Sequence, residues 1–212
     1  MRNMIKKQSV RNIMMMVLLI VMITLTIIQN QQEKLINTNV GTVNTKKIEW
    51  GIKRNDNHEQ PDVGSENRKV LEENNGIALG NSESKAIYLT FDEGYEAGYT
   101  SQILETLKEN DVKATFFLTA HYINTQEELV KQMIDEGHII GNHTVNHKSM
   151  PSLTAEEIKK EVMDLHQSVY EKFGYEMKYI RPPKGEFSEK TLQVTNSLGY
   201  KTVMWSFAYE DW

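Results

Sequence analysis

The stretch AIYLTFDEGYE, residues 86–96, joins an apolar run to three acidic residues. The run predicts a buried strand over 86–91. It leads directly into two adjacent carboxylates, Asp92 and Glu93, with a third acid at Glu96. Like charges held together at a half-buried position are costly, because each carboxylate disfavours the ionised form of the others. The stretch therefore indicates a site at which another group shares the charge.

Short apolar runs alternate with helical patterns along the rest of the chain. In the helical segments apolar residues recur at intervals of three and four, and two segments begin with a capping-box pattern, Thr125 with Glu128 and Thr154 with Glu157. The apolar runs predict further strands over 114–119, 138–142, 178–181 and 201–207. The helical patterns predict helices over 100–110, 125–137, 154–174 and 188–199.

This alternation predicts an α/β fold in which crossover helices join parallel strands. A doubly wound sheet and a (β/α) barrel both fit the pattern. Both architectures place their chemistry at the carboxyl ends of the strands. We therefore expect one rim of the sheet to collect the residues at these ends, which are Asp92, Glu93, His143, His147, Arg181, Trp205, Asp211 and Trp212.

The segment HTVNH places His143 and His147 four residues apart, directly after the third predicted strand. In a helical turn this spacing would put both rings on one side. Alone, such a pair also fits surface or capping histidines. With the acid pair on the same rim, two imidazoles and a carboxylate provide ligands for Zn²⁺ or another divalent first-row ion. The metal would take up the charge of one carboxylate and leave the other free as a base.

The segment RPPKG, residues 181–185, follows the fourth predicted strand. It fits a rigid turn, because two prolines fix the exit of the strand. It also fits a functional role, because the Arg181 guanidinium can pair with the carboxylate that does not bind metal. Tyr95 and Glu96 either line a substrate groove or hold their loop. The predicted substrate contacts are Tyr95, Glu96, Pro183, Trp205, Asp211 and Trp212.

The motifs TFDEGYE, HTVNH and RPPKG, in this order, resemble those of the polysaccharide deacetylases of carbohydrate esterase family 4, the NodB homology domain. HIIGNHTVNH, RPPKGEFSE and WSFAYEDW are similar to the branch that deacetylates muramic acid for the delta-lactams of the spore cortex. The resemblance covers residues 85–212. It implies a distorted (β/α) barrel, a divalent metal, with zinc expected, and hydrolysis of an N-acetyl group on a peptidoglycan amino sugar.

Carried over by position, the resemblance makes Asp92 the general base, Glu93, His143 and His147 the metal ligands, and Arg181 the residue that orients Asp92. Glu93 departs from the family, which has Asp here, while the muramic-acid branch often has Asn. The alternative substrates are N-acetylglucosamine of peptidoglycan and chitin-like glycans.

The family also places a late histidine as general acid, and no histidine follows His166. We therefore expect a deacetylase domain that is incomplete at its C-terminus. The alternative function is a membrane-tethered glycan-binding pseudoenzyme that lacks the general acid. If the chain is active as it stands, His121 is the first candidate for the missing proton donor.

The first thirty residues predict a membrane segment. Four cations, with no acid among them, precede sixteen uncharged residues over 13–28. An uncleaved signal-anchor and a cleaved signal peptide both fit, and both place the remaining chain outside the cytoplasm. We expect a signal segment over 1–30, a polar tether over 31–46, an extension of the deacetylase domain over 47–84, and the deacetylase domain over 85–212.

Composition excludes several functions. The formal net charge is -5, which argues against general nucleic-acid binding, because that requires a basic face. The chain has no cysteine, so thiolate metal sites, disulfides and a cysteine nucleophile are excluded. The expected partners are peptidoglycan glycan strands and, through the N-terminal segment, a membrane.

Overall fold

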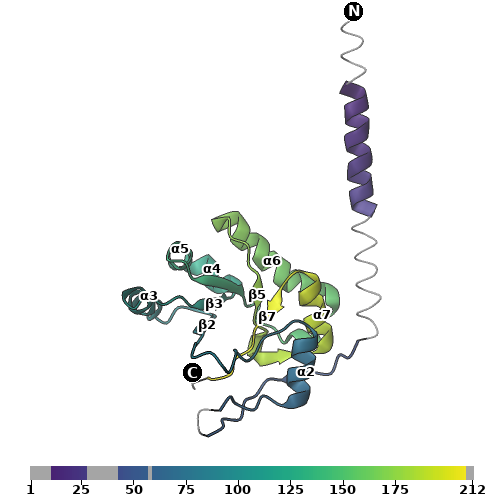
Figure 1. The fold of residues 1–212 in the computed structure, drawn as a ribbon. Helices are drawn as coiled ribbons and strands as arrows, with labels where there is room; N and C mark the ends of the chain where they lie inside the picture. The colour runs from purple at the N-terminus through teal and green to yellow at the C-terminus, as the bar shows by residue number, and fades with distance from the viewer. Residues whose placement is uncertain (1–10, 28–42, 57–58, 209–212) are drawn as a thin grey trace, which may run out of the picture. The chain divides into compact units, whose positions relative to one another are not determined.

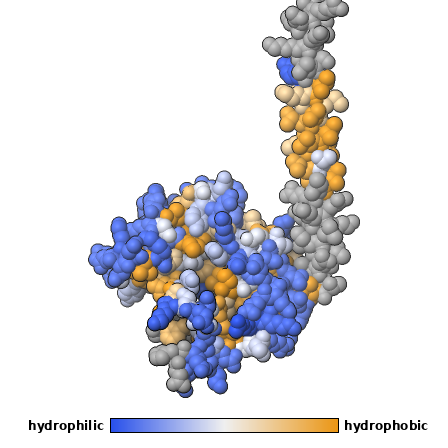
Figure 2. Space-filling view, viewed as in Figure 1, coloured by the Kyte–Doolittle hydropathy of each residue, from blue (hydrophilic) through white to orange (hydrophobic). Residues whose placement is uncertain are grey.

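The computed structural model describes residues 11–27, 43–56 and 59–208. The chain forms two units, residues 1–42 and 43–212. In the first unit residues 11–27 form a helix, and apolar side chains cover it (Figure 2). Within the described ranges, no helix is both long and apolar enough to cross a membrane. The membrane helix expected over 1–30 is therefore not supported, and parts of that segment lie outside the described residues.

The second unit contains a five-stranded parallel sheet. Its strands are β2 (Thr90–Glu93), β3 (Thr115–Leu118), β4 (Ile139–Asn142), β5 (Tyr179–Ile180) and β7 (Lys201–Thr202), and they lie in this order. Each strand is added at the same edge, so right-handed crossovers place all connecting helices on one face. This winding is that of a (β/α) barrel, and it excludes the doubly wound alternative.

The connecting helices form an outer row around the strands (Figure 1). They are α3 (Thr100–Glu109), α4 (Ala120–Thr125), α5 (Glu127–Asp135), α6 (Ala155–Phe173) and α7 (Glu189–Ser197). The capping box of Thr154 and Glu157 is confirmed, and left-handed Gly174 ends α6 as expected. The capping box predicted at Thr125 is wrong, because this residue ends α4 and α5 begins two residues later.

The core lies between the sheet and these helices. β3 contributes three fully buried residues, Phe116, Phe117 and Leu118, and the helices contribute residues spaced by three and four. Those of α6 recur on one face of the helix. They are Ile158, Val162, Leu165 and Val169, all fully buried.

The extension packs on the same domain. Its strand β1 (Ile48–Glu49) pairs antiparallel with β6 (Glu186–Phe187), and Ile77 forms a parallel bridge to Val203 beside β7. Helix α2 (Ser65–Glu73) buries Leu71. These elements enclose a second apolar cluster of Trp50, Val63, Leu71, Phe187, Leu192 and Met204.

The strand predicted over 86–91 is only partly correct. β2 begins at Thr90, and Ile87 and Tyr88 are 87% and 78% exposed. β2 pairs on one side only, with β3, and forms one end of the described sheet. Because no described strand covers that edge, the apolar run before it is not buried.

Candidate active site

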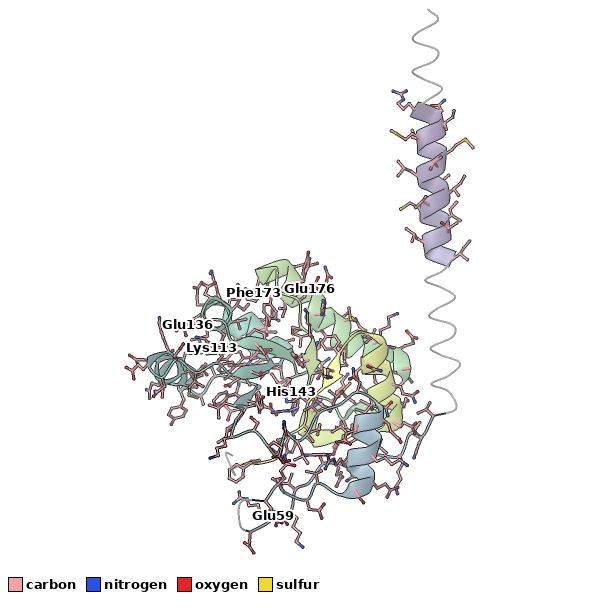
Figure 3. The ribbon with its side chains drawn as sticks, in the orientation of Figure 1. Glu59, Lys113, Glu136, His143, Phe173 and Glu176 are labelled. Atoms are coloured by element: carbon pink, nitrogen blue, oxygen red, sulfur yellow. The ribbon has the colours of Figure 1, made fainter. Side chains whose placement is uncertain are left out.

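The predicted site residues meet at the carboxyl ends of the parallel strands. Asp92 lies near the end of β2, His143 directly follows β4 and Arg181 directly follows β5. Figure 3 shows His143 at the opposite end of the sheet from Glu136 and Glu176, which precede β4 and β5. Asp92, His143 and Arg181 therefore share one rim, whereas Asp211 and Trp212, expected at the same rim, lie outside the described residues.

Arg181 and Asp92 form the central ion pair. Arg181 Nη1 lies 2.7 Å from Asp92 Oδ1, and the Arg181 side chain is only 4% exposed whereas that of Asp92 is 36% exposed. Arg181 Nε donates to the Val203 carbonyl at 3.1 Å, and the guanidinium lies 4.3 Å from the centre of the Phe117 ring. These contacts fix one Asp92 oxygen and leave the other open to the site.

The His143 ring is oriented by the backbone. Its Nδ1 lies 2.8 Å from the Arg181 carbonyl, which can only accept, so Nδ1 carries the proton and donates. Nε2 therefore has a free lone pair, and it lies 3.9 Å from Asp92 Oδ2. Burial lowers the pKa of His143. The ring is neutral at neutral pH, which is the form that binds a metal.

His147 lies against His143, with ring centres 4.8 Å apart and an edge-to-face geometry. Burial and the Lys184 charge lower the pKa of His147. The two rings do not meet through a helical turn as the spacing suggested. Thr144 and His147 have positive φ of 68° and 52°, so a tight loop after β4 brings the rings together.

Glu93 does not join this group. In β2 consecutive side chains point to opposite faces, so Asp92 and Glu93 diverge. The carboxylate that acts electrostatically on both histidines is Asp92. Burial raises the pKa of Glu93 to about 7, and Glu96 and Asp92 add to the effect. The role of Glu93 as a ligand stays a prediction, but the geometry favours Asp92 as the carboxylate nearest the histidines.

Two of the predicted ligands, His143 and His147, have a chemistry that suits a divalent metal. His143 and His147 are neutral, lie in contact, and His143 presents an unprotonated Nε2 toward Asp92. In the described ranges, no group of three or more His, Cys, Asp or Glu side chains is arranged to hold a metal ion. The role of the two imidazoles as metal ligands therefore stays a prediction.

Glu96 anchors the loop after β2. Its Oε1 accepts hydrogen bonds from the backbone N–H groups of Gly98 and Thr100, at 2.5 and 3.3 Å. Its Oε2 accepts from the Tyr122 hydroxyl at 2.9 Å. Of the two interpretations for Glu96, the geometry favours holding the loop over lining a groove.

The remaining predicted contacts differ in exposure. Tyr95 is 71% exposed and is free to meet a ligand. Pro183 is buried in the 3-10 turn η2 (Pro183–Gly185), and half-buried Trp205 packs beside that turn. Pro183 therefore shapes the exit of β5. Asp211 and Trp212 lie outside the described residues.

Sequence reasoning missed two supports of the histidine loop. Buried Asn142, at the end of β4, accepts from the Thr144 N–H at 2.9 Å, and the Thr144 hydroxyl accepts from the His147 N–H at 3.1 Å. In the sequence, these hydrogen bonds are indicated only by Thr144, which lies between the two histidines, and by Asn142, which precedes them. These signals are weak, because Asn and Thr occur in many loops.

A family model described as polysaccharide deacetylase matches residues 79–203. The chain belongs to this family, which confirms the resemblance drawn from the three motifs. The peptidoglycan-N-acetylmuramic acid deacetylase PdaA of Bacillus subtilis is 46% identical over 171 residues, covering 80% of this chain and 65% of that protein. A peptidoglycan-N-acetylglucosamine deacetylase of Bacillus cereus is 36% identical over 126 residues, covering 59% of this chain and 46% of that protein.

Solved structures agree with this assignment. The structure of B. subtilis PdaA, a family 4 carbohydrate esterase, matches with a TM-score of 0.78 over 80% of this chain and 73% of that one. A family 4 carbohydrate esterase from Bacillus anthracis, 43% identical, matches with a TM-score of 0.74 over 81% and 78% of the two chains. The present chain spans slightly less than two thirds of the length of PdaA.

Proposed function

We propose that this protein hydrolyses the N-acetyl group of an amino sugar in peptidoglycan. The observation that carries the proposal is the convergence of Asp92, Arg181, His143 and His147 at one end of the sheet. The family assignment and the 46% identity to a peptidoglycan deacetylase support it.

In the proposed reaction Asp92 is the general base. A water molecule adds to the acetyl carbon while its proton passes to the open oxygen of Asp92, and the C–N bond then breaks to give acetate and the free sugar amine. Arg181 holds the other Asp92 oxygen at 2.7 Å, so the base keeps a fixed direction. The leaving nitrogen takes up one proton, and Asp92 gives up the proton that it took from the water, so the protons bound and released are equal in number.

His143 and His147 would hold a divalent metal, for which zinc is the proposed ion. When bound, the metal polarises the acetyl carbonyl and the water and so lowers the barrier to addition. The protein's own contribution is to favour the neutral form of both rings, because burial lowers the pKa of His143, and partial desolvation with the Lys184 charge lowers the pKa of the exposed His147. It also fixes the tautomer of His143 through the Arg181 carbonyl.

The test is acetate release from purified peptidoglycan, with and without added zinc. We expect release by the wild-type chain and a loss of about 10²–10⁴-fold in Asp92→Asn, the range typical of a general base. Glu105→Gln is the control, because Glu105 is an exposed carboxylate of α3. Glycan and zinc binding without acetate release would refute the proposal and indicate a glycan-binding pseudoenzyme.

We propose N-acetylmuramic acid, the substrate for spore-cortex delta-lactam formation, rather than N-acetylglucosamine. Muramic acid carries a lactyl carboxylate that glucosamine lacks. The cation suited to it is Lys184, which is exposed and acts electrostatically on His147. Lys184 lies between Pro183 and Gly185 and has a positive φ of 60°. Its side chain therefore leaves the backbone in a different direction from that of a residue in a right-handed turn.

KM values measured on glycan strands with and without free lactyl carboxylates distinguish the two proposed substrates. We expect Lys184→Gln to raise KM for the carboxylate-bearing glycan and to leave the neutral glycan unaffected. Lys178→Gln is the control, because Lys178 precedes β5 at the other end of the strand. Equal effects of Lys184→Gln on both glycans would refute this assignment.

We also propose that the domain acts outside the cytoplasm, where peptidoglycan lies. The basic N-terminal residues followed by the uncharged run over 13–28 support this. Protease digestion of intact cells tests it: loss of the domain without lysis is expected, and full protection would refute the proposal.

A further inference from the structure

The loop that carries both histidines is held from a helix. Thr144 and His147 adopt left-handed φ angles, which non-glycine residues keep only where their surroundings enforce them. Position 143 is additionally tied to β3, because its N–H donates to the Leu118 carbonyl at 3.0 Å. Something must hold the part of the loop that follows.

The hydrogen bonds of that part converge on Glu161 of α6. The Val145 N–H donates to the Glu161 carbonyl at 3.2 Å, and the Asn146 N–H donates to Glu161 Oε2 at 2.8 Å. The Asn146 side-chain amide donates to Glu161 Oε1 at 2.7 Å. One residue thus accepts two successive backbone N–H groups and the side chain between the two histidines.

Glu161 is a buried, charged residue on the otherwise apolar face of α6. Its side chain is 7% exposed, and Ile158, Val162 and Leu165 around it are fully buried. Its cationic neighbour, Lys148, lies 3.4 Å from Oε1 and is itself 56% exposed. A buried carboxylate is costly, and an apolar residue would serve the packing of α6 better. The loop is the contact that accounts for it.

We propose that Glu161 is the positioning residue that fixes His147 relative to His143. It clamps Asn146, the residue immediately before His147, by both its backbone and its side chain. With His143 tied to β3 and Arg181, the clamp sets the spacing between the two imidazoles. This inference rests on the proposed function only in taking the two histidines as metal ligands.

Glu161→Gln is the decisive substitution, because it keeps the size of the side chain. Asn146 presents two donors to the two Glu161 oxygens. The substitution replaces the carboxylate with a neutral amide, so both hydrogen bonds lose their charge assistance even where the Asn146 amide turns over to accept from the new nitrogen. We expect the dissociation constant for Zn²⁺ to rise about 10–100-fold, the range for residues that orient metal ligands. Glu171→Gln is the matched control, because Glu171 lies in the same helix and accepts its hydrogen bond from Gln167, away from the histidine loop.

A compensating change separates positioning from general damage. In the double variant Glu161→Gln with Asn146→Asp, the new amide donates to the new carboxylate while its oxygen still accepts the backbone N–H. We expect this pair to recover most of the zinc affinity. If Glu161→Gln fails to fold, Asn146→Ala is the second test, because Asn146 is exposed and the substitution removes only its side-chain hydrogen bond to Glu161. It should also weaken zinc binding.

A metal-free measurement keeps this inference independent of the enzymatic activity. Hydrogen exchange of the Asn146 amide, whose acceptor is the Glu161 side chain, should accelerate in Glu161→Gln and remain slow in Glu171→Gln. Unchanged exchange together with unchanged zinc affinity would overturn the proposal. A wild-type chain that binds zinc but releases no acetate would refute the proposed function and leave the clamp standing.

Discussion

Gly141→Ala tests how the core supports the active site. Gly141 lies in β4, one residue before Asn142, and pairs with Phe117 of β3. A Cβ at this position would lie 2.4 Å from Phe117 Cδ1 and 2.6 Å from Cε1, whereas ordinary contact begins at 3.4 Å. The ring is fully buried and carries the Arg181 guanidinium on its face. The added methyl group therefore acts on both stability and the Arg181–Asp92 pair.

The magnitude follows from the distances. The Phe117 ring must retreat by about 1 Å, the difference between the 2.4 Å contact and the 3.4 Å limit. Overpacking of this kind costs about 1–3 kcal/mol in a close-packed core. Gly→Ala also restricts the unfolded chain, which stabilises the native state by about 0.4–1 kcal/mol. A matched glycine is therefore needed as the reference.

Gly51 is that reference, because a Cβ added to it would meet nothing within 4 Å and its φ is not positive. Urea unfolding should place Gly141→Ala about 1–3 kcal/mol below Gly51→Ala in stability. Adding Phe117→Leu should recover part of that loss, because the smaller side chain vacates the position. Acetate release should fall in Gly141→Ala and not in Gly51→Ala. Equal stability of the two alanine variants, within about 0.5 kcal/mol, would refute the reasoning.

Three further perturbations test individual residues. His143→Ala should abolish stoichiometric zinc binding, because it deletes one of few ligands; metal analysis after gel filtration that finds the wild-type zinc content would rule this site out. Glu93 has a folded pKa of about 7 against 4.5 for the free group, so the native state holds its proton more tightly and loses stability as the pH rises from about 4.5 to about 7. The metal-free Glu93→Gln variant should accordingly melt above the wild type at pH 8 and with it at pH 4, and a pH-independent difference would contradict the raised pKa. Glu96→Gln should cost about 1–2 kcal/mol, because the carboxylate accepts from two backbone N–H groups and the Tyr122 hydroxyl, while leaving zinc affinity unchanged; a large loss of affinity would instead place Glu96 at the metal.

The sequence was sufficient to group the strand-end residues of the second unit. Strand–helix alternation requires parallel strands, and parallel strands bring their carboxyl ends to one rim. Asp92, His143 and Arg181 could therefore be grouped from the order of motifs and strands alone. Helix α6 was equally accessible, since its capping box, apolar spacing and terminal glycine are all local signals.

Local patterns failed where a neighbour decides the outcome. The run before β2 is as apolar as a core strand, but Ile87 and Tyr88 are exposed because no described strand pairs with that edge. Thr125 begins a valid capping pattern, but it is the last residue of α4 and so cannot cap a new helix. Whether an apolar or capping residue realises its preference depends on what packs beside it.

The sequence by itself determined which residues stand at the rim: Asp92, His143, His147 and Arg181 follow from motif and strand order. Only the tertiary structure decided which groups they face. It paired Arg181 with Asp92, placed Asp92 as the carboxylate that acts electrostatically on both histidines, and brought Glu161 from α6 onto their loop. The physical reason is that strand order is encoded by local periodicity and chain handedness. The direction of a side chain, by contrast, depends on contacts between segments far apart in the sequence.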